Sequence, residues 1–242
     1  MITEKQTKAL NDIIKSSKRA VFFGGAGVST ESGIPDFRSA DGIYMMNYRY
    51  PPEEILSHMF FMQHTEEFYE FYRKHLCGKG VEPNAAHLKL AELERAGILA
   101  AVVTQNIDGL HTKAGSKTVY ELHGSTLRNH CMKCGKFYDA DYVFGSEGVP
   151  KCSCGGVIKP DVVLYQEALD EDTVDGAIRA IKDADTLIVA GTSLTVYPAA
   201  SFIRYFKGND LIIINRDPTP QDGSFDLVIH DSVGKVLSKI NL

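Results

Sequence analysis

Short, unbroken runs of apolar residues recur along the chain and predict buried strands. They cover residues 20–23, 99–103, 186–190, 211–214 and 226–229. Unbroken runs, unlike alternating ones, are typical of strands that are covered on both faces, as in a parallel sheet flanked by helices. Stretches with helical spacing separate them, at residues 84–96, 172–182, 197–207 and 232–240. This alternation predicts an α/β fold with a doubly wound, Rossmann-like parallel sheet.

Two stretches interrupt the alternation and predict a second, smaller domain. Residues 40–80 are rich in aromatic side chains at helical spacing, and residues 125–160 hold four cysteines. We therefore expect these two insertions to form a small helical and zinc-binding domain. The Rossmann-like domain then comprises residues 1–39, 81–124 and 161–242.

Composition and charge narrow the class of protein. The 242 residues include 26 Lys and Arg against 31 Asp and Glu, a formal net charge of −5, and 44% are hydrophobic. An acidic balance argues against nucleic-acid binding, which normally needs a basic face. No apolar run approaches the roughly 18 residues of a membrane helix, and the polar N-terminus does not resemble a signal peptide. We expect a cytoplasmic protein that binds neither nucleic acid nor membranes, with its oligomeric state left open.

Four of the five cysteines form a regular set that predicts a metal site. Cys131, Cys134, Cys152 and Cys154 have the spacing C-x2-C-x17-C-x-C, whereas Cys77 stands alone. In a reducing compartment, two close pairs at this separation indicate zinc rather than disulfides. Four thiolates complete the coordination of zinc and leave no position for substrate, so we expect a structural ion. Cys77 is expected to be a buried apolar residue.

The first predicted strand runs into a glycine-rich loop. Residues 24–38 read GGAGVSTESGIPDFR, and glycines after a buried strand let the backbone approach a pyrophosphate. The match to G-x-G-x-x-G is incomplete because Thr30 takes the third glycine position. A dehydrogenase would also place a second strand and a ribose-binding acid about 20 residues further on, where this chain has an aromatic insertion. The loop is therefore either a dinucleotide site modified for chemistry other than hydride transfer or a tight strand–helix turn.

Polar residues follow other predicted strands. Residues 104–111 read TQNIDGLH, residues 190–194 read AGTSL and residues 215–217 read NRD. Gln, Asn and Asp side chains can hydrogen-bond ribose hydroxyls and a carboxamide, although the first segment is also compatible with an Asx-type turn. Because the carboxyl ends of parallel strands face one ligand crevice, these turns predict a single groove.

One histidine follows a short predicted strand and is expected in the same crevice. His123 comes directly after residues 119–122 and precedes a glycine. A histidine in such a position can titrate near neutrality and act as a general base. The alternatives are a histidine satisfied by structural contacts and a zinc ligand. His130, which directly precedes Cys131, is the stronger competitor for zinc.

Taken together, these segments resemble the sirtuins, which are NAD-dependent protein lysine deacylases. The matching motifs follow family order from about residue 20 to 217, and the chain is similar to a bacterial member that consists of the catalytic core. They are Gly25-Ala26-Gly27-Val28-Ser29, Gly33-Ile34-Pro35-Asp36-Phe37-Arg38, Gln105-Asn106-Ile107-Asp108, Glu121-Leu122-His123-Gly124, the four clustered cysteines, Lys159-Pro160-Asp161-Val162-Val163, Gly191-Thr192-Ser193-Leu194 and Asn215.

The resemblance implies a role for each matched residue. His123 would be the general base, and Asn106 and Asp108 would shape the nicotinamide pocket as further catalytic residues. Phe37 would shield the reactive carbon after nicotinamide leaves, and Arg38 would contact phosphate. The other residues that would bind NAD are Ala26, Gly27, Ser29, Thr30, Gln105, Ile107, Gly191, Thr192, Ser193, Asn215 and Val233. The substrate peptide would be clamped as an added strand by Val162, Val163, Leu164, Leu194 and Val196.

The resemblance also implies the reaction, which is NAD-dependent removal of an acyl group from protein lysine. The acyl amide oxygen would attack the nicotinamide ribose as nicotinamide leaves, and His123 would draw a proton from the ribose hydroxyls. Water would then release lysine and O-acyl-ADP-ribose, so NAD is consumed and the zinc takes no part. Three alternatives remain open: protein ADP-ribosyl transfer, a non-catalytic NAD-sensing module, and an NAD-linked dehydrogenase.

Two departures from the family pattern bear on the site. Tyr165-Gln166-Glu167 stands where Phe-Gly-Glu is usual. Members that prefer succinyl-lysine carry a Tyr-x-x-Arg pair. Here Tyr72 stands three positions after Tyr69, where that pair has its arginine, and Arg73 would reach the acyl group only in a shifted register. We therefore expect an uncharged acyl group, most simply acetyl. Aromatic packing against the zinc module is the structural interpretation of the same helix.

Overall fold

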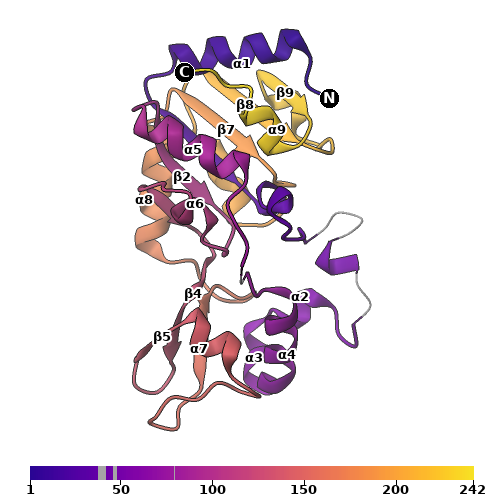
Figure 1. Ribbon diagram of the computed structural model, residues 1–242, viewed down its shortest axis with the longest axis vertical. Helices are drawn as coiled ribbons and strands as arrows, with labels where there is room; N and C mark the ends of the chain where they lie inside the picture. Colours follow the sequence, from indigo (N-terminus) through magenta and orange to yellow (C-terminus); the bar gives the residue numbers. More distant parts are fainter. Residues whose placement is uncertain (38–41, 46–47, 79) are drawn as a thin grey trace.

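The computed structural model describes residues 1–37, 42–45, 48–78 and 80–242 and has an upper and a lower half (Figure 1). The upper half contains a parallel sheet with the strand order β3-β2-β1-β7-β8-β9. Its strands are β1 (Ala20–Gly24), β2 (Leu99–Thr104), β3 (Val119–Glu121), β7 (Thr186–Ala190), β8 (Asp210–Asn215) and β9 (Leu227–His230). This is the order of a doubly wound dinucleotide fold, so the predicted fold class is confirmed.

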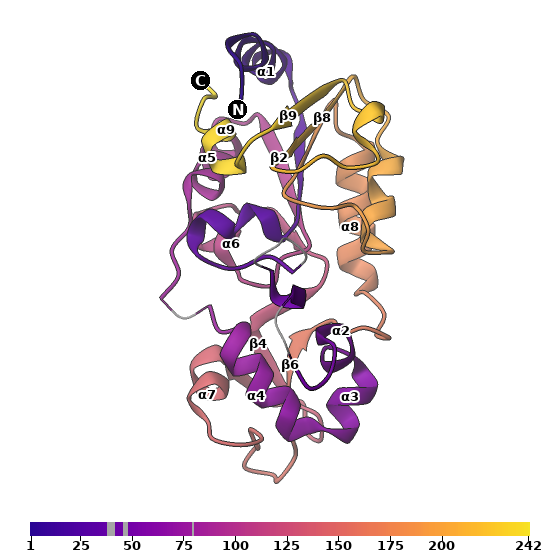
Figure 2. The same cartoon turned by 90° about the vertical axis from the view of Figure 1, so that its right-hand side faces the viewer.

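Helices cover both faces of this sheet (Figure 2). They are α1 (Glu4–Ser16), α5 (Ala85–Arg95), α6 (Leu110–Lys113), α8 (Glu171–Lys182) and α9 (Val233–Leu237), with 3-10 segments η1 (Ala26–Val28), η2 (Thr30–Ser32), η4 (Ala199–Tyr205) and η5 (Asp222–Ser224). In β1, Phe22 packs into the core under α1, α5 and α9, whereas Val21 and Phe23 pack into the core under α8 and η4. Because both faces are buried, the strands have no polar face and appear as unbroken apolar runs.

Two predicted helices differ from the structure, each for a local reason. In the 197–207 stretch the chain forms the 3-10 segment η4, where the Ser201 hydroxyl donates to the Pro198 carbonyl at 2.6 Å and competes with helical hydrogen bonding. The 232–240 stretch is helical as α9 only to Leu237. Beyond it, Asn11 of α1 donates to the Lys239 carbonyl at 2.9 Å and ties the chain to another element.

The lower half has an antiparallel sheet and a core of its own. Its elements are η3 (Ile43–Met45), α2 (Pro52–Ile55), α3 (His58–Gln63), α4 (Thr65–His75), β4 (Gly124–Cys131), β5 (Phe137–Asp139), α7 (Ala140–Gly145) and β6 (Ile158–Val162). The strand order is β5-β4-β6. Phe68, Tyr69 and Tyr72 of α4 are fully buried and pack in one cluster with Cys131 and Cys152. The two insertions therefore share one hydrophobic core.

The aromatic helix α4 turns its polar groups into the lower half. The Tyr69 hydroxyl donates to the Ile158 carbonyl, and Arg73 donates to the Gly148 carbonyl. Tyr72 stacks on Phe144 with ring centroids 5.2 Å apart. The structure thus agrees with the interpretation that the aromatic side chains of α4 pack within the lower half.

Among the residues that the structure describes, none of the helices has the length and apolar character needed to span a bilayer.

Candidate active site

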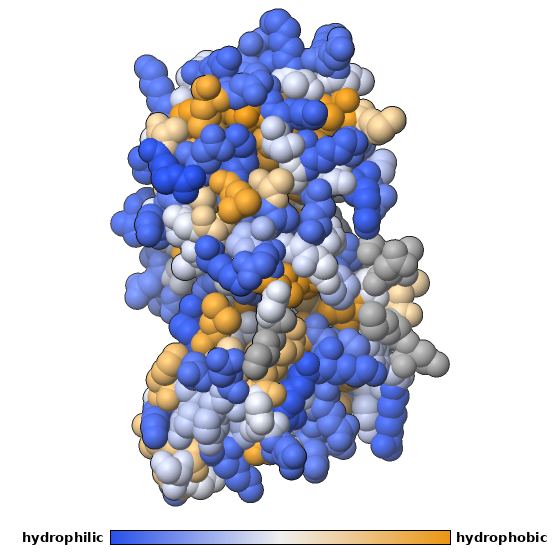
Figure 3. Space-filling view, in the orientation of Figure 1, coloured by the Kyte–Doolittle hydropathy of each residue, from blue (hydrophilic) through white to orange (hydrophobic). Residues whose placement is uncertain are grey.

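A cavity of 860 Å³ lies between the two halves and is lined by both. Its walls are the loop after β1, the residues that follow β2, β3, β7 and β8, and the segment after β6. Apolar side chains are exposed at the level where the halves meet (Figure 3). The polar turns at the strand ends therefore do meet in a single groove, at the edge of the sheet where α/β folds bind ligands.

Glycines interlock the loops that follow β1 and β7. The Gly27 N–H donates to the Gly191 carbonyl at 2.8 Å. A Cβ on Gly27 would lie 2.8 Å from the Gly191 Cα, and one on Gly25 would lie 2.8 Å from the Gly191 oxygen. Gly191 has a φ of 60°, in the left-handed region that favours glycine. Close backbone packing between the two loops therefore requires these glycines.

A chain of hydrogen bonds orders polar groups across three strand ends. Gln105 Nε2 donates to Thr192 Oγ1 at 3.1 Å. The Thr192 N–H donates to Asn215 Oδ1 at 3.0 Å, and Asn215 Nδ2 donates back to the Thr192 carbonyl at 2.9 Å. All three residues line the cavity. Their remaining donors and acceptors suit the hydroxyls of a ribose.

A second network orders Asp108. Ser29 Oγ donates to Asp108 Oδ2 at 2.7 Å, and the Leu110 N–H donates to Asp108 Oδ1 at 2.9 Å. Asn106 Nδ2 donates to the same Ser29 oxygen at 3.0 Å. The glycine loop and the end of β2 thus hold an amide and a carboxylate side by side in the cavity. Such a pair can accept from and donate to a carboxamide.

The His123 ring is held by one nitrogen. Its Nδ1 lies 3.0 Å from the Gln105 carbonyl oxygen, which can only accept, so the neutral ring carries its proton on Nδ1 and has a lone pair on Nε2. Burial lowers the pKa of His123 below its ordinary value, and the Gln105 hydrogen bond opposes the shift. The ring lines the cavity, and neither His123 nor His130 belongs to the cysteine cluster. The geometry suits a general base.

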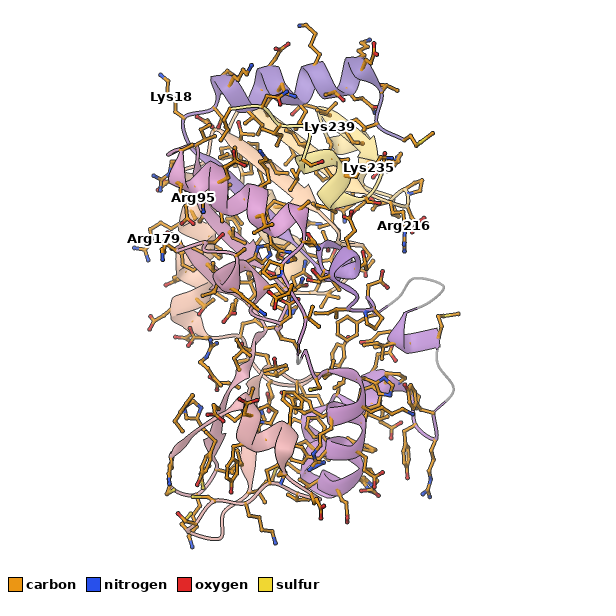
Figure 4. The ribbon with its side chains drawn as sticks, viewed as in Figure 1. Lys18, Arg95, Arg179, Arg216, Lys235 and Lys239 are labelled. Atoms are coloured by element: carbon orange, nitrogen blue, oxygen red, sulfur yellow. The ribbon has the colours of Figure 1, made fainter. Side chains whose placement is uncertain are left out.

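Two cations line the described part of the cavity wall, Lys74 and Arg216. Arg216 follows β8 (Figure 4), its side chain is 58% exposed, and its Nη2 lies 3.9 Å from Asp36 Oδ2. The other cations labelled in Figure 4 do not line the cavity. Arg216 Nε also lies 3.9 Å from Asp217 Oδ2, so Arg216 is an exposed cation that is paired loosely with two carboxylates.

The remaining predicted residues occupy several positions. Those that line the cavity are Ala26, Thr30, Phe37, Ile107, Val162, Val163, Leu164, Ser193, Val196 and Val233. Leu194 does not line it: the residue is 2% exposed and packs in the core under α8 and η4. Arg38 lies outside the described residues. Cys77, expected to be buried, is half-buried and lines the cavity because α4 ends just before it.

The sequence did not predict that His87 and His111 form a buried pair. His87 of α5 and His111 of α6 have ring centroids 4.7 Å apart, and His111 has no hydrogen-bond partner at either nitrogen. Burial lowers the pKa of His87 to about 4, with Asp108 opposing the shift, and lowers that of His111 to about 3. Both rings are therefore neutral at pH 7.

The four clustered cysteines fit a zinc ion. The sulfur atoms of Cys131, Cys134, Cys152 and Cys154 all lie within 4.8 Å of one another. Two pairs are 3.5 Å apart and one is 3.6 Å apart. Tetrahedral Zn–S bonds of about 2.3 Å require sulfurs slightly under 4 Å apart, whereas a disulfide needs about 2.05 Å. This set fits zinc and lies apart from the residues that line the cavity.

Comparison with known proteins decides the family. The model of the Sir2 family matches residues 25–198. The chain belongs to the Sir2 family. This Sir2-family chain is 58% identical to an NAD-dependent protein deacetylase of Clostridium acetobutylicum, over 99% of the chain and 100% of that protein. The expected family and its Rossmann-like fold are thereby confirmed, and the four clustered cysteines are positioned to bind a metal ion.

Solved structures of the family agree with the fold. A Sir2 protein with deacetylated p53 peptide and 3′-O-acetyl ADP ribose has a TM-score of 0.88 at 38% identity and covers 96% of each chain. A Sir2 structure with p53 peptide and NAD+ has a TM-score of 0.84 at 39% identity, covering 96% of this chain and 95% of the other. The likeness therefore extends over both halves.

Proposed function

We propose that this Sir2-family chain is an NAD-dependent protein lysine deacetylase. The observation that carries the proposal is the His123 ring, which is held through Nδ1 in a cavity that the glycine loop and the polar strand ends also line. A neutral imidazole with an unprotonated Nε2 can take a proton from a ribose hydroxyl. A protein 58% identical to this chain is named for the same activity.

The polar residues at the end of β2 are proposed to bind the nicotinamide half of NAD. Asn106 and Asp108 offer an amide and a carboxylate to the carboxamide, with Ile107 beside them, and Gln105 contacts the ribose. Support comes from the networks through Ser29 and Thr192, which fix these groups before a ligand binds. Fixed dipoles cost little reorganisation during a reaction.

The glycine loop and the far strand ends are proposed to hold the rest of the dinucleotide. Phe37 lines the cavity, and an aromatic ring there excludes water from the reacting sugar carbon. Arg38 is proposed to contact phosphate. The other proposed contacts are Ala26, Gly27, Ser29, Thr30, Gly191, Thr192, Ser193, Asn215 and Val233.

The acyl-lysine peptide is proposed to lie as an extended strand between two segments. Val162, Val163 and Leu164 of one segment line the cavity, and so does Val196 of the other. Leu194 is a further proposed contact, although it is buried and its N–H donates to Thr192 Oγ1 at 3.2 Å. Strand addition gives affinity through main-chain hydrogen bonds, with modest selectivity for the peptide sequence.

An uncharged acyl group, most simply acetyl, suits this cavity. Recognition of succinyl-lysine through a Tyr-x-x-Arg pair would need Arg73 at the acyl group, and Arg73 is instead engaged by the Gly148 carbonyl in the lower half. Neither Tyr69, Tyr72 nor Arg73 is among the described residues that line the cavity. We expect deacetylation to be much faster than desuccinylation on the same peptide.

The chain is proposed to divide as its sequence suggests, with 1–39, 81–124 and 161–242 binding NAD and 40–80 and 125–160 forming the small domain. The separate core of the lower half supports two domains, and this core extends past residue 160 to Val162 and Leu164. The zinc ion would be held by Cys131, Cys134, Cys152 and Cys154 and would supply structure, since four thiolates leave no open coordination position.

A cytoplasmic location, without nucleic-acid or membrane partners, fits the acidic net charge of −5.

Product analysis tests the function directly. The protein is incubated with NAD and an acetyl-lysine peptide, and the products are identified by mass. We expect one nicotinamide and one O-acetyl-ADP-ribose for each lysine released. Retention of ADP-ribose on the peptide would indicate ADP-ribosyl transfer instead, and reduced nicotinamide would indicate a dehydrogenase.

The base is tested by His123→Ala. General-base catalysis contributes about 10²- to 10⁴-fold, so we expect a loss in kcat of that order. The control is His130→Ala, whose side chain is 43% exposed and pairs with Asp161 rather than lining the cavity. Full activity in the His123 variant would show that the assigned base is wrong.

A further inference from the structure

Two tyrosine hydroxyls meet at the edge of the cavity. Tyr44 Oη and Tyr165 Oη are 2.8 Å apart, the distance of a direct hydrogen bond between hydroxyls. Both residues line the cavity. They belong to segments 121 positions apart in the chain, and the contact adds a polar link to the apolar packing that these segments share.

Tyr44 is tied to Phe37. The Tyr44 N–H donates to the Phe37 carbonyl at 2.9 Å, and the Ile43 N–H donates to the Asp36 carbonyl at 2.9 Å. The rings of Phe37 and Tyr44 meet edge to face, with centroids 5.5 Å apart and an angle of 63°. Since both backbone and ring are engaged, a displacement of Tyr44 also displaces Phe37.

Tyr165 is fixed to the lower half and follows the segment proposed for the peptide. Its N–H donates to the Leu56 carbonyl at 3.0 Å, and its carbonyl accepts from the His58 N–H at 2.9 Å. Residues 162–164, directly before it, line the cavity. Tyr165 is therefore an anchored point from which its hydroxyl reaches the Tyr44 side of the cavity.

We propose that the Tyr44–Tyr165 hydroxyl pair positions Phe37 over the reacting sugar carbon and so limits the loss of NAD to water. The proposal rests on the proposed function. Tyr44 and Tyr165 are positioning residues, because they act through Phe37. The peptide segment and the Phe37 ring are thereby linked by one hydrogen bond, and peptide bound along 162–164 lies beside its anchored end.

The side reaction that the pair suppresses is simple hydrolysis. The bond between nicotinamide and C1′ of the ribose breaks, and its electron pair leaves with nicotinamide. The oxygen of water forms a bond to C1′ and loses a proton. NAD and water thus give nicotinamide, ADP-ribose and a proton, and no acyl group is transferred.

The test measures how many NAD molecules are consumed for each lysine that is deacetylated. The variants are Tyr44→Phe, Tyr165→Phe and the double variant, all assayed with NAD and an acetyl-lysine peptide. Loss of one hydrogen bond between neutral groups corresponds to about a two- to tenfold effect. We expect each single variant to raise the ratio of hydrolysis to deacetylation by that factor, and the double variant to resemble either single one.

A matched control removes a hydroxyl elsewhere. Tyr205→Phe alters a tyrosine that is 41% exposed and does not line the cavity, and its ratio should equal that of the wild type. An unchanged ratio in Tyr165→Phe, or effects of the single variants that add in the double variant, would overturn the proposal. A wild-type protein that does not deacetylate would instead overturn the proposed function.

Discussion

The carboxylate of Asp108 is oriented by two donors before any substrate binds. Ser29 and the Leu110 N–H each engage one of its oxygens, at 2.7 and 2.9 Å. Asn106 is 8% exposed and shares the Ser29 hydroxyl. Hydrogen bonds within the protein therefore set the position of the carboxylate that faces the proposed carboxamide. Its role can be tested by a substitution that replaces one of its oxygen atoms.

Asp108→Asn replaces one acceptor oxygen by a donor and removes the charge. Hydrogen bonds to charged groups contribute about 1.5–3 kcal/mol, so we expect kcat/KM for NAD to fall by about ten- to a hundredfold. Steady-state kinetics of nicotinamide release measures the change. Asp12→Asn is the matched control, since Asp12 pairs with Lys8 on an exposed helix surface and should retain wild-type kinetics. Equal kinetics for both variants would contradict the role of Asp108.

The buried histidines predict an acid-sensitive fold. The pKa values of His87 and His111 are about 4 and about 3 in the folded protein, below the ordinary 6.5. Between pH 6.5 and these lower values, the unfolded chain binds more protons than the folded one. The free energy of unfolding is therefore highest above about pH 6.5 and falls as the pH decreases. At pH 5 each histidine lowers the free energy of unfolding by about 2 kcal/mol.

His111→Leu removes one of these penalties. We expect the loss of stability between pH 7 and pH 5, measured by urea unfolding, to be about 2 kcal/mol smaller in the variant than in the wild type. The loss is measured for each protein separately, and the two losses are then compared, so that acid effects shared by both proteins cancel. An identical loss in both proteins would show that His111 is not kept neutral by the fold.

At the scale of elements, the loops after β1 and β7 depend on close backbone contact. Gly27→Ala places a Cβ 2.8 Å from the Gly191 Cα, and overpacking of this kind costs about 1–3 kcal/mol. We expect the melting temperature to fall by about 2–10 °C, and NAD binding to weaken. Gly223→Ala in η5 is the control, because a Cβ there meets nothing within 4 Å. Equal melting temperatures would contradict the interlocking of the loops.

The strands of the upper sheet are predictable from the sequence, whereas the antiparallel sheet is not. Strand β7 coincides with its predicted range, since burial on both faces leaves a continuous apolar signal. Strand β4 mixes buried and exposed positions without regular alternation, and part of its stability is expected from a metal that hydropathy does not record. Its cysteines revealed the module but not its strands.

The candidate site shows the same contrast. His123 and Asp108 could be predicted because they follow strands, and strand ends of a parallel sheet share one edge. The His87–His111 pair depends on how α5 packs against α6, which no local pattern encodes. The contact between Tyr44 and Tyr165 likewise joins positions that only the tertiary structure brings together.

At the scale of the whole molecule, the two halves have separate cores but share one cavity. The upper sheet is packed on both faces by its own helices, and the lower half is packed around α4 and the cysteines. Arg128 of β4 connects them by contacting Glu121 of β3 at 2.8 Å, but its side chain is 44% exposed. Because the apolar clusters of the two halves are separate, we expect each core to depend mainly on its own packing.

Removal of zinc should therefore unfold the lower half and spare the upper sheet. With a chelator, we expect one zinc ion to leave per chain, amide hydrogen exchange to accelerate in residues 124–162, and β1, β7 and β8 to keep their protection. Deacetylation should stop, because the lower half supplies the wall at 162–164, and added zinc should restore it. Cys134→Ser should behave like the chelated protein, whereas Cys77→Ser should retain its zinc, since Cys77 lies outside the cluster. If exchange in 124–162 stays slow after the metal has left, the lower half is held by its aromatic core alone, and the structural role of the ion is refuted.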